Sequence, residues 1–262
     1  MYGICHLGVV PCRFEPSDKS EMVTQLLFGE TFEILKQEGK WLQIRITLDG
    51  YECWIDEKQY LPLSEEQYKK QSAFPVTCSA DLVDLVTKTS DKSLTPVLGG
   101  SALPAYEHGK LFIGDQEFSF DGEITHPLSE NENIPALVAE YATVFLNAPY
   151  LWGGRSVFGI DCSGFTQVVF KMAGIQLKRD AYQQAEQGTT LSFVEEAQTG
   201  DLAFFDNEEG KIIHTGIVLS QGKIIHASGK VRVDKLDHQG IFNNDTKKYS
   251  HKLRLIKRVL QK

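Results

Sequence analysis

The chain has 262 residues, a length that predicts two domains or three small ones. It carries 27 Lys and Arg against 35 Asp and Glu, so its formal net charge is −8. This charge argues against a nucleic-acid partner or an anionic membrane, because binding either one requires a basic face. Hydrophobic residues make up 42% of the chain and charged residues 24%, which excludes disorder as the main state.

The cysteine pattern is that of reduced thiols. The chain has five cysteines, an odd number that cannot all pair: Cys5, Cys12, Cys53, Cys78 and Cys162. None of them forms a Cys-x-x-Cys pair, so the sequence gives no support for a zinc ribbon or a redox motif. The first residues lack the basic start and long apolar core of an export signal, and no run of 18 apolar residues predicts a membrane span. The sequence therefore predicts a cytoplasmic protein that does not enter a membrane.

Residues 1–64 are expected to form a small all-β barrel. Short runs rich in β-branched and aromatic residues end in Gly, Asp or Pro, and Asp49-Gly50 predicts a tight hairpin turn. The pattern of this segment is carried by Gly29, Glu30, Trp41, Asp49, Gly50, Tyr51 and Trp54. In these residues the segment resembles the bacterial SH3-like domains that are found beside cell-wall hydrolases.

The next part of the chain repeats the β-like character. The run SEEQYKKQSAF is predicted to be a short polar connector, and residues 72–128 are rich in Gly and Pro with no sustained helical stripe. This segment is expected to be a second, divergent SH3-like barrel. Its run from Gly100 to Pro104 is similar to the second SH3-like domain of some relatives of the family named below.

Residues 129–262 change in character and predict an α+β domain. The run NIPALVAEYATVFLNA has apolar residues at helical spacing, and a second helix is expected over DCSGFTQVVFKMAG, with Gly174 as its stop. Three strand-like runs follow, LAFF, HTGIVLS and KIIHAS. Two helices followed by an antiparallel sheet give the α+β class.

Cys162 stands in the run Asp161-Cys162-Ser163-Gly164 at the start of the second helix. A thiol in a first helical turn meets unpaired backbone N–H groups and the positive end of the helix dipole, and both favour the thiolate. A lone cysteine more often packs as a small hydrophobe. The position is therefore a candidate nucleophile that needs further support.

Two histidines supply that support. His214 is predicted to open the strand HTGIVLS, and His226 lies 12 residues later near the end of KIIHAS. Antiparallel strands joined by a tight turn place these ends side by side, so both imidazoles are expected at the sheet edge that faces Cys162. His214 would then take the thiol proton and His226 would orient it, as in a catalytic triad.

The complete motif set identifies a family. The runs are Ala148 to Arg155, Gly159 to Gly164, Gly200 to Leu202, His214 to Ile217 and Ile225 to Ser228. In this order and spacing, residues 135–262 resemble the NlpC/p60 peptidases, which are papain-like cysteine peptidases that act on bacterial cell-wall peptides. The resemblance implies Cys162 as nucleophile, His214 as base, His226 as orienting residue and Tyr150 as a hydroxyl that supports the oxyanion.

The N-terminal SH3-like segments imply a narrower group within that family. Its members cut the γ-D-glutamyl to diamino-acid bond of murein peptides with a free N-terminal L-Ala, and an acid and a tyrosine of the first barrel hold the ammonium. The resemblance places these roles on Glu21 and Tyr51, with Glu30 or Glu52 as alternative acids. A solvated strand-edge acid and an exposed turn tyrosine are the structural alternatives. No cofactor or metal is implied.

Further site residues come from the resemblance alone. Asp161 is implied to face the amine end of the substrate, whereas Ser163 and Trp152 are implied to line the D-Glu pocket. Relatives often have a serine where Ala181 stands, so one hydrogen bond to the D-Glu carboxylate is expected to be missing or to come from backbone.

Two alternative functions remain open. One is an amidase or acyltransferase acting on another amine-bearing substrate, and the other is a non-catalytic module that binds wall peptides. The intact set of Cys162, His214 and His226 argues against the second. The sequence leaves open both the oligomeric state and the choice between lysine and diaminopimelate.

Overall fold

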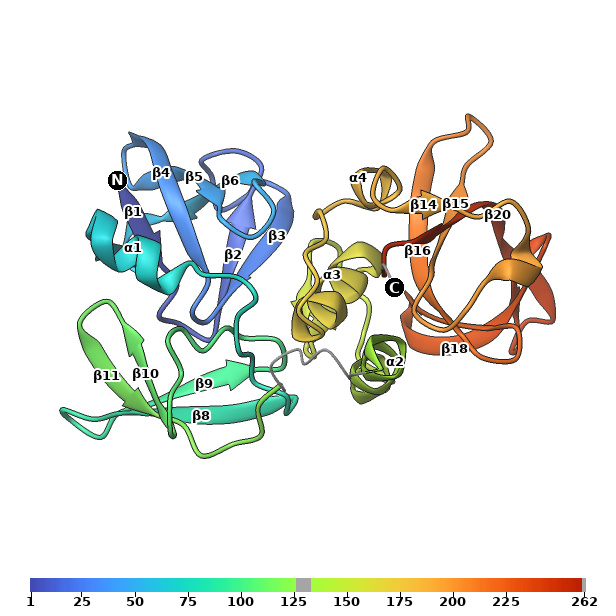
Figure 1. Ribbon diagram of the computed structural model, residues 1–262. Helices are drawn as coiled ribbons and strands as arrows, with labels where there is room; N and C mark the ends of the chain where they lie inside the picture. Colours follow the sequence, from blue (N-terminus) through green and yellow to red (C-terminus); the bar gives the residue numbers. More distant parts are fainter. Residues whose placement is uncertain (126–132, 261–262) are drawn as a thin grey trace.

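The computed structural model describes residues 1–125 and 133–260 (Figure 1). His126 and the predicted boundary between residues 128 and 129 lie outside the described residues. In the described parts of the chain, no helix is long and apolar enough to cross a membrane.

The N-terminal region is an antiparallel sheet of seven strands in the order β3-β2-β6-β5-β4-β1-β7. The strands are β1 (Tyr2–Ile4), β2 (Val9–Arg13), β3 (Met22–Leu27), β4 (Thr31–Glu38), β5 (Trp41–Ile46), β6 (Glu52–Asp56) and β7 (Leu61–Leu63), with a 3-10 turn at Glu57–Gln59 before β7. Alternate apolar side chains of these strands form a buried cluster around Phe32, Ile44 and Ile55.

The predicted tight turn at Asp49-Gly50 is wrong in its length. Strands β5 and β6 pair as a hairpin, but residues 47–51 connect them, with Gly50 at a φ of +76°. The buried Asp49 accepts hydrogen bonds from the backbone N–H of Tyr51 at 2.9 Å and from Nε2 of Gln167 at 2.8 Å. The longer loop therefore docks the N-terminal sheet onto the C-terminal half of the chain.

The predicted polar connector contains a helix, α1 (Glu65–Gln71). Ser64 accepts a hydrogen bond from the backbone N–H of Gln67, and the Gln67 side chain accepts one from the backbone N–H of Ser64. This reciprocal pair is a capping box, which stabilises the first turn of a helix. The Ser-x-x-Gln spacing was the signal for this helix in the sequence.

The middle region is a four-stranded sheet in the order β10-β11-β8-β9. Its strands are β8 (Val83–Lys88), β9 (Leu94–Leu98), β10 (Lys110–Ile113) and β11 (Gln116–Ser119). Its hydrophobic cluster also contains Ile4, Phe28 and Leu63 from the N-terminal sheet. The four-stranded sheet therefore buries its apolar face against the N-terminal region, which also has its own cluster around Phe32, Ile44 and Ile55.

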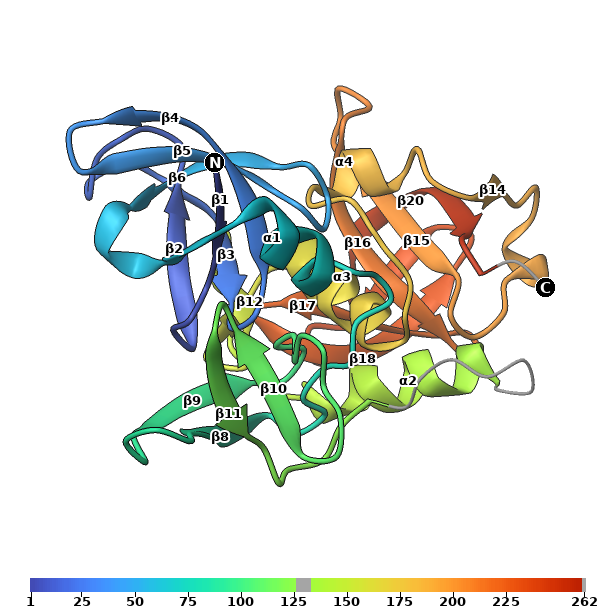
Figure 2. The same ribbon diagram turned by 60° about the vertical axis from the view of Figure 1, so that its left-hand side comes forward.

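The C-terminal half combines three helices with a second large sheet (Figure 2). The helices are α2 (Ile134–Val144), α3 (Cys162–Met172) and the single turn α4 (Ala181–Gln184), a small ladder joins β12 (Arg155–Ser156) to β13 (Gly159–Ile160), and a 3-10 turn spans Val194–Glu196. The sheet strands are β14 (Thr189–Thr190), β15 (Leu202–Asp206), β16 (Ile212–Leu219), β17 (Lys223–Ser228), β18 (Lys230–Asp237), β19 (Gly240–Asn243) and β20 (Lys248–Arg258). Their order is β14-β20-β15-β16-β17-β18-β19, and β19 also pairs with β20, which closes the sheet on itself.

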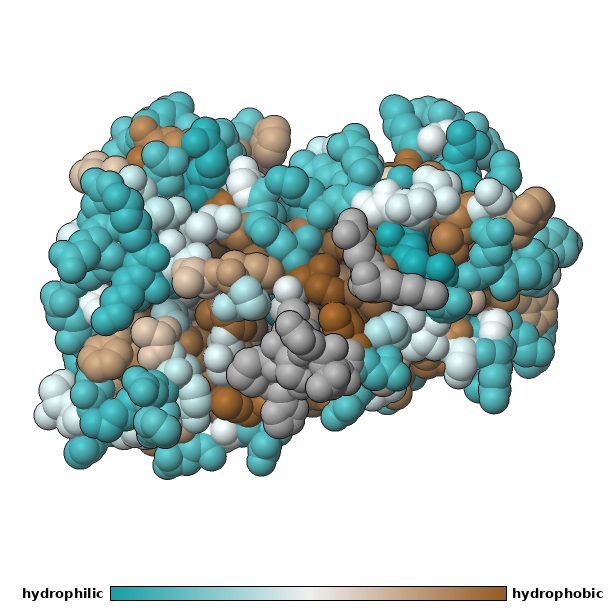
Figure 3. Space-filling view, in the orientation of Figure 1, coloured by the Kyte–Doolittle hydropathy of each residue, from teal (hydrophilic) through white to brown (hydrophobic). Residues whose placement is uncertain are grey.

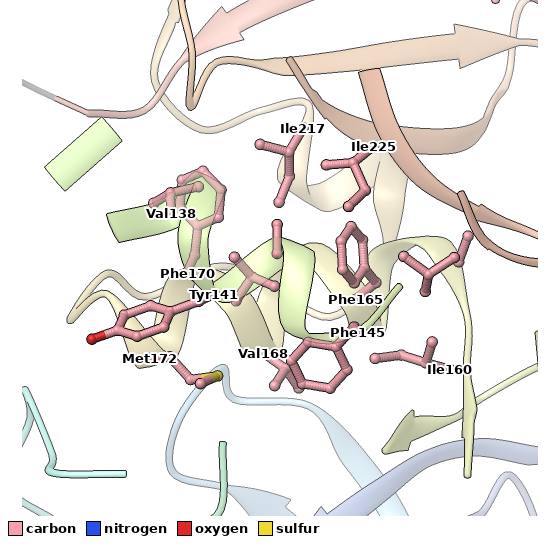
Figure 4. Packing of buried hydrophobic residues seen from close by; sticks show 14 of the residues in the cluster. Val138, Tyr141, Phe145, Ile160, Phe165, Val168, Phe170, Met172, Ile217 and Ile225 are labelled. Carbon is pink, nitrogen blue, oxygen red and sulfur yellow. The ribbon is translucent and has the colours of Figure 1, made fainter. Parts of the chain in front are cut away.

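Helix α3 lies at the centre of the molecule, and all of its residues are buried. Its Phe165 packs edge-on against Phe145 of the segment after α2, and both lie in the cluster that includes Ile217 and Ile225 of the sheet (Figure 4). In the space-filling view, apolar residues gather between the two halves of the molecule, whereas the outer rims are mostly hydrophilic (Figure 3). Helix α3 is thus held by protein on all sides.

Buried charges join the N-terminal sheet to α3 and β12. Glu30 is 4% exposed and binds Arg155 through both carboxylate oxygens, at 2.7 and 2.9 Å, and Nζ of Lys171 at 2.7 Å. Lys171 also donates to the carbonyl of Gly100 in the middle region at 2.8 Å. A single carboxylate therefore links the N-terminal region directly to the C-terminal half, and Lys171 extends the link to the middle region.

Candidate active site

Cys162 is the first residue of α3, and Asp161 caps this helix. The Asp161 carboxylate accepts a hydrogen bond from the backbone N–H of Gly164 at 2.6 Å, which satisfies one of the free donors of the first turn. The thiol is 7% exposed and faces the cavity described below. The predicted position of Cys162 at a helix N-terminus is therefore confirmed, and its role as the nucleophile stays a prediction.

The ionisation of Cys162 is a balance of opposed effects. Burial raises the pKa of the thiol to about 12 with a contribution from Asp161, while hydrogen bonds from the backbone at Thr215 and Ser163 lower it. Cys162 does lie in the predicted helix-start environment, which favours the thiolate, but burial has the larger effect on its pKa. The group is therefore a thiol at neutral pH, and its thiolate forms only when a base takes the proton.

The two histidines lie next to each other on neighbouring strands. Nε2 of His214 on β16 is 2.8 Å from Nδ1 of His226 on β17, and the two rings are 5% and 1% exposed. Strand β16 begins at Ile212, so His214 is inside the strand instead of opening it. The backbone of Thr215, the next residue, hydrogen-bonds the Cys162 sulfur, which places this part of β16 against the start of α3.

Two groups from strands that the sequence analysis did not identify complete this cluster. Asp234 of β18 lies 3.2 Å from Nε2 of His226, and Arg232 donates to the same carboxylate at 2.6 and 3.0 Å. The ring of His251 on β20 stacks on that of His214, with the ring centres 4.1 Å apart. Burial lowers the pKa of His214 well below its usual range, with further contributions from His251 and His226.

The substrate-binding residues proposed from sequence meet in one cavity. It has a volume of about 460 Å³, and seven of the nine predicted site residues line it, whereas His214 and His226 do not. The seven are Glu21, Tyr51, Tyr150, Trp152, Asp161, Cys162 and Ser163. The N-terminal sheet and the C-terminal half each supply one wall. A site of this composition exists only when the two halves are docked.

The cavity is lined by a carboxylate and a phenol of the N-terminal sheet, Glu21 and Tyr51, and by a carboxylate of the C-terminal half, Asp180. The Glu21 carboxylate accepts a hydrogen bond from Nε1 of Trp152 at 2.5 Å across the cavity. Asp180, which precedes α4, accepts hydrogen bonds from the hydroxyls of Tyr51 and Tyr182. Asp180 was missed in the sequence, where it stands in RDAYQQ beside the noted Ala181, which also lines the cavity.

The alternative acids are placed elsewhere. Both carboxylate oxygens of Glu30 are occupied by Arg155 and Lys171, and Glu52 forms an exposed ion pair with Arg45. Neither residue lines the cavity.

Asp161 and Ser163 are engaged by Arg179, a buried residue that the sequence analysis did not single out. The guanidinium donates to both oxygens of Asp161, at 3.1 and 2.6 Å, and to Oγ of Ser163 at 2.9 Å. Its Nε also donates to Oγ1 of Thr24 in the N-terminal sheet at 2.7 Å. Arg179 therefore neutralises the charge of Asp161, which the role implied by the family resemblance had not indicated.

Tyr150 and Gly153 frame the nucleophile from the preceding loop. Burial, Cys162 and Asp161 together raise the pKa of Tyr150 to about 12, so its hydroxyl stays a neutral donor. Gly153 has a φ of +73°, and a Cβ there would lie 2.2 Å from the carbonyl oxygen of Met22. This glycine is required for the close approach of the N-terminal sheet.

A cysteine at a helix start, packed against the strand of a buried histidine pair, is the arrangement of a cysteine peptidase. In the described residues, no group of three or more His, Cys, Asp or Glu side chains is placed to hold a metal ion. The NlpC/P60 family model matches residues 147–250, and the bacterial dipeptidyl-peptidase Sh3 domain model matches residues 13–59.

Known proteins agree with these matches. The gamma-D-glutamyl-L-lysine dipeptidyl-peptidase of Bacillus subtilis (strain 168) is 30% identical over 217 residues, covering 78% of this chain and 71% of that protein. Dipeptidyl-peptidase 6 of Lysinibacillus sphaericus is 26% identical over 255 residues, covering 86% of this chain and 88% of the relative. The crystal structure of an NlpC/P60 family protein from Bacillus cereus ATCC 10987 shares the fold, with a TM-score of 0.81, 20% identity and full coverage of both chains.

The chain belongs to the NlpC/P60 family. The predictions of a cysteine peptidase and of an N-terminal SH3-like region are confirmed, as is the α+β class.

Proposed function

We propose that the protein hydrolyses the bond between the γ-carboxyl group of D-Glu and a diamino acid in murein peptides that carry a free N-terminal L-Ala. The observation that carries this proposal is the cavity that joins the Cys162 thiol to the carboxylates of Glu21 and Asp180. Relatives of this chain are named for cleavage between γ-D-glutamate and L-lysine. A peptide of this kind offers an ammonium at one end and a scissile amide further along.

The amine end of the cavity is suited to a cation. The cavity wall contains Glu21, Asp180 and Asp161, whose charge is neutralised by Arg179, and no Lys, Arg or His side chain of the described residues lines it. An ammonium requires acceptors, and two carboxylates with the nearby Tyr51 oxygen supply them. Because the N-terminal sheet closes this end, the site selects peptides whose free amine lies at a fixed distance from the bond that is cleaved.

The reaction proceeds through an acyl-enzyme. His214 takes the proton of Cys162, the sulfur attacks the γ-carbonyl carbon, and the Tyr150 hydroxyl donates to the oxyanion. His214 then gives the proton to the amino group of the leaving diamino acid. Water, deprotonated by His214, cleaves the thioester and releases L-Ala-D-Glu with the free thiol restored.

The experiment is cleavage of L-Ala-γ-D-Glu-L-Lys and of its diaminopimelate counterpart, followed by chromatography. We expect release of the L-Ala-D-Glu dipeptide and far slower cleavage of the N-acetylated peptide. Equal rates for the free and acetylated peptides would refute measurement from the amine. Transfer of L-Ala-D-Glu to an added amine in place of water would instead favour the acyltransferase alternative.

A matched pair of variants tests the amine site. Glu21→Gln removes a charged acceptor worth about 1.5–3 kcal/mol, so we expect kcat/KM for the free-amine peptide to fall by about 10- to 150-fold. Glu52→Gln makes the same chemical change outside the cavity and is expected to leave the rate unchanged. An equal loss in both variants would contradict the assignment of Glu21.

The finer organisation is also a proposal. We assign residues 1–64 and 72–128 to two SH3-like barrels and residues 129–262 to the catalytic domain. The separate seven- and four-stranded sheets of the N-terminal half support this division. The closed amine end suits free peptides and excludes stems whose alanine is capped, which agrees with a cytoplasmic role in recycling.

A further inference from the structure

We propose that Asp234, held by Arg232, is a positioning residue that sets the tautomers of both active-site histidines, so that Nδ1 of His214 is left as the proton acceptor for Cys162. The inference rests on the proposed roles of Cys162 and His214. It adds one more residue to that set, the carboxylate of Asp234 on β18.

Asp234 has its acceptor sites filled by fixed donors. Oδ1 accepts from Nη2 of Arg232 at 3.0 Å and from the backbone N–H of Asn244 at 2.9 Å, and Oδ2 accepts from Nε of Arg232 at 2.6 Å. Nε2 of His226 lies 3.2 Å from the same Oδ2. Burial alone would raise the pKa of Asp234, but these hydrogen bonds outweigh it and hold the pKa well below the usual range.

The proton positions then follow in sequence. An ionised carboxylate only accepts hydrogen bonds, so Nε2 of His226 must carry a proton. In a neutral His226 this leaves Nδ1 as a lone pair, and the only fitting partner at 2.8 Å is a protonated Nε2 of His214. A neutral His214 that carries its proton on Nε2 has a free lone pair on Nδ1.

Both rings are neutral in this arrangement for a physical reason. Burial is the first cause that lowers the pKa of each histidine, although Asp234 partly offsets it at His226. When His214 receives the Cys162 proton, its Nε2–H bond to His226 stays in place. The proton moves from sulfur to Nδ1 and no proton moves to Asp234, which balances the step.

The variant Asp234→Asn tests the tautomer argument. The amide NH2 of Asn can only donate, so it is unfavourable wherever it faces another donor. At the Oδ1 site it would face two donors, Arg232 and the backbone N–H of Asn244. At the Oδ2 site it would face one fixed donor, Nε of Arg232, and a histidine that can change tautomer. The second orientation is therefore favoured. It makes Nε2 of His226 the acceptor and moves a proton onto Nδ1 of both rings, so that His214 cannot take the thiol proton.

The readout is the rate at which iodoacetamide alkylates Cys162, measured beside peptide turnover. The other four cysteines are at most 2% exposed, and Cys162→Ala gives the background. We expect both rates to fall by about 10³-fold or more in Asp234→Asn, the scale of a wrong-tautomer defect in a catalytic triad. Asp237→Asn is the control, because Asp237 lies on the same strand and binds Tyr249 instead of the histidines.

A second variant separates positioning from general damage to the fold. In His226→Asn, the amide oxygen takes the place of Nδ1 and accepts from Nε2 of His214 without help from Asp234. We expect Asp234→Asn to change the alkylation rate by less than about threefold in that background. An equal loss in both backgrounds, or no loss in the single variant, would overturn the proposal.

The wild-type protein gives a test that requires no variant. Nitrogen-15 NMR of histidine-labelled protein distinguishes protonated from unprotonated ring nitrogens, and we expect protons on Nε2 of both His214 and His226. A proton on Nδ1 of His214 would refute the inference. Because this readout needs no peptide, failure of the proposed substrate would leave it unaffected.

Discussion

Glu30 offers the sharpest test of how the two halves form one site. Its carboxylate faces two buried cations, Arg155 and Lys171, which belong to the C-terminal half. Glu30→Gln keeps the shape of the side chain but leaves both cations without a counter-charge. Breaking a buried ion pair from one side costs about 3–5 kcal/mol.

The pKa of Glu30 gives an independent magnitude. Burial alone would raise it, but Arg155 and Lys171 outweigh burial and lower the pKa from 4.5 to about 2. This difference corresponds to about 3 kcal/mol of stability. Because the folded-state pKa is depressed, the contribution is fully present above pH 4.5 and is lost as the pH falls towards 2.

The assay is thermal unfolding followed by circular dichroism. At about 2–4 °C for each kcal/mol, Glu30→Gln is expected to lower the midpoint by roughly 10 °C at pH 7, and by less at pH 3. Glu33→Gln is the control, since Glu33 forms only an exposed pair with Arg45 that is worth under about 1 kcal/mol. Adding Lys171→Met to Glu30→Gln is expected to recover part of the loss, because it removes one unpaired cation.

Equal midpoints for Glu30→Gln and Glu33→Gln would refute the reasoning. A loss that does not shrink between pH 7 and pH 3 would show that the charge of Glu30 is not the cause.

Three further predictions concern the active site. Cys162→Ala is expected to abolish peptide cleavage while leaving the unfolding midpoint within a few degrees, and wild-type turnover in this variant would remove Cys162 as the nucleophile. The acid limb of the pH profile of kcat/KM is expected below pH 6.5, because burial lowers the pKa of His214, and a midpoint above 6.5 would contradict this. Ala181→Ser adds a hydroxyl to the cavity wall and is expected to raise kcat/KM by up to about tenfold for a peptide with a free D-Glu carboxylate, as measured against its amidated form.

Local patterns in the sequence were enough to single out Cys162 and the two histidines. Cys162 stands in a helix-start motif, and His214 and His226 each lie in a clear strand run, so neighbouring strands bring the two rings together. The Ser64-x-x-Gln67 pattern would also have identified α1 as a helix. In each of these places a short-range rule decides the structure.

The remaining residues depend on contacts between segments far apart in the chain. Asp234 stands in KVRVDKLD, and it meets His226 only because this run pairs with β17. Arg179 meets Thr24 across 155 positions, and Glu30 meets Lys171 across 141. No spacing rule in one sequence links such positions, so their partners emerge only from the folded chain.

Buried arginines decide which acids of this acidic protein are free to interact with the proposed peptide substrate. Of the acids near the nucleophile, Asp161 is neutralised by Arg179 and Asp234 by Arg232, so neither is free to attract or repel substrate. The carboxylates left at the cavity wall are Glu21 and Asp180, which lie at the end assigned to the ammonium. Charge selection therefore depends on which acids have a buried arginine partner, and the net charge of −8 does not determine it.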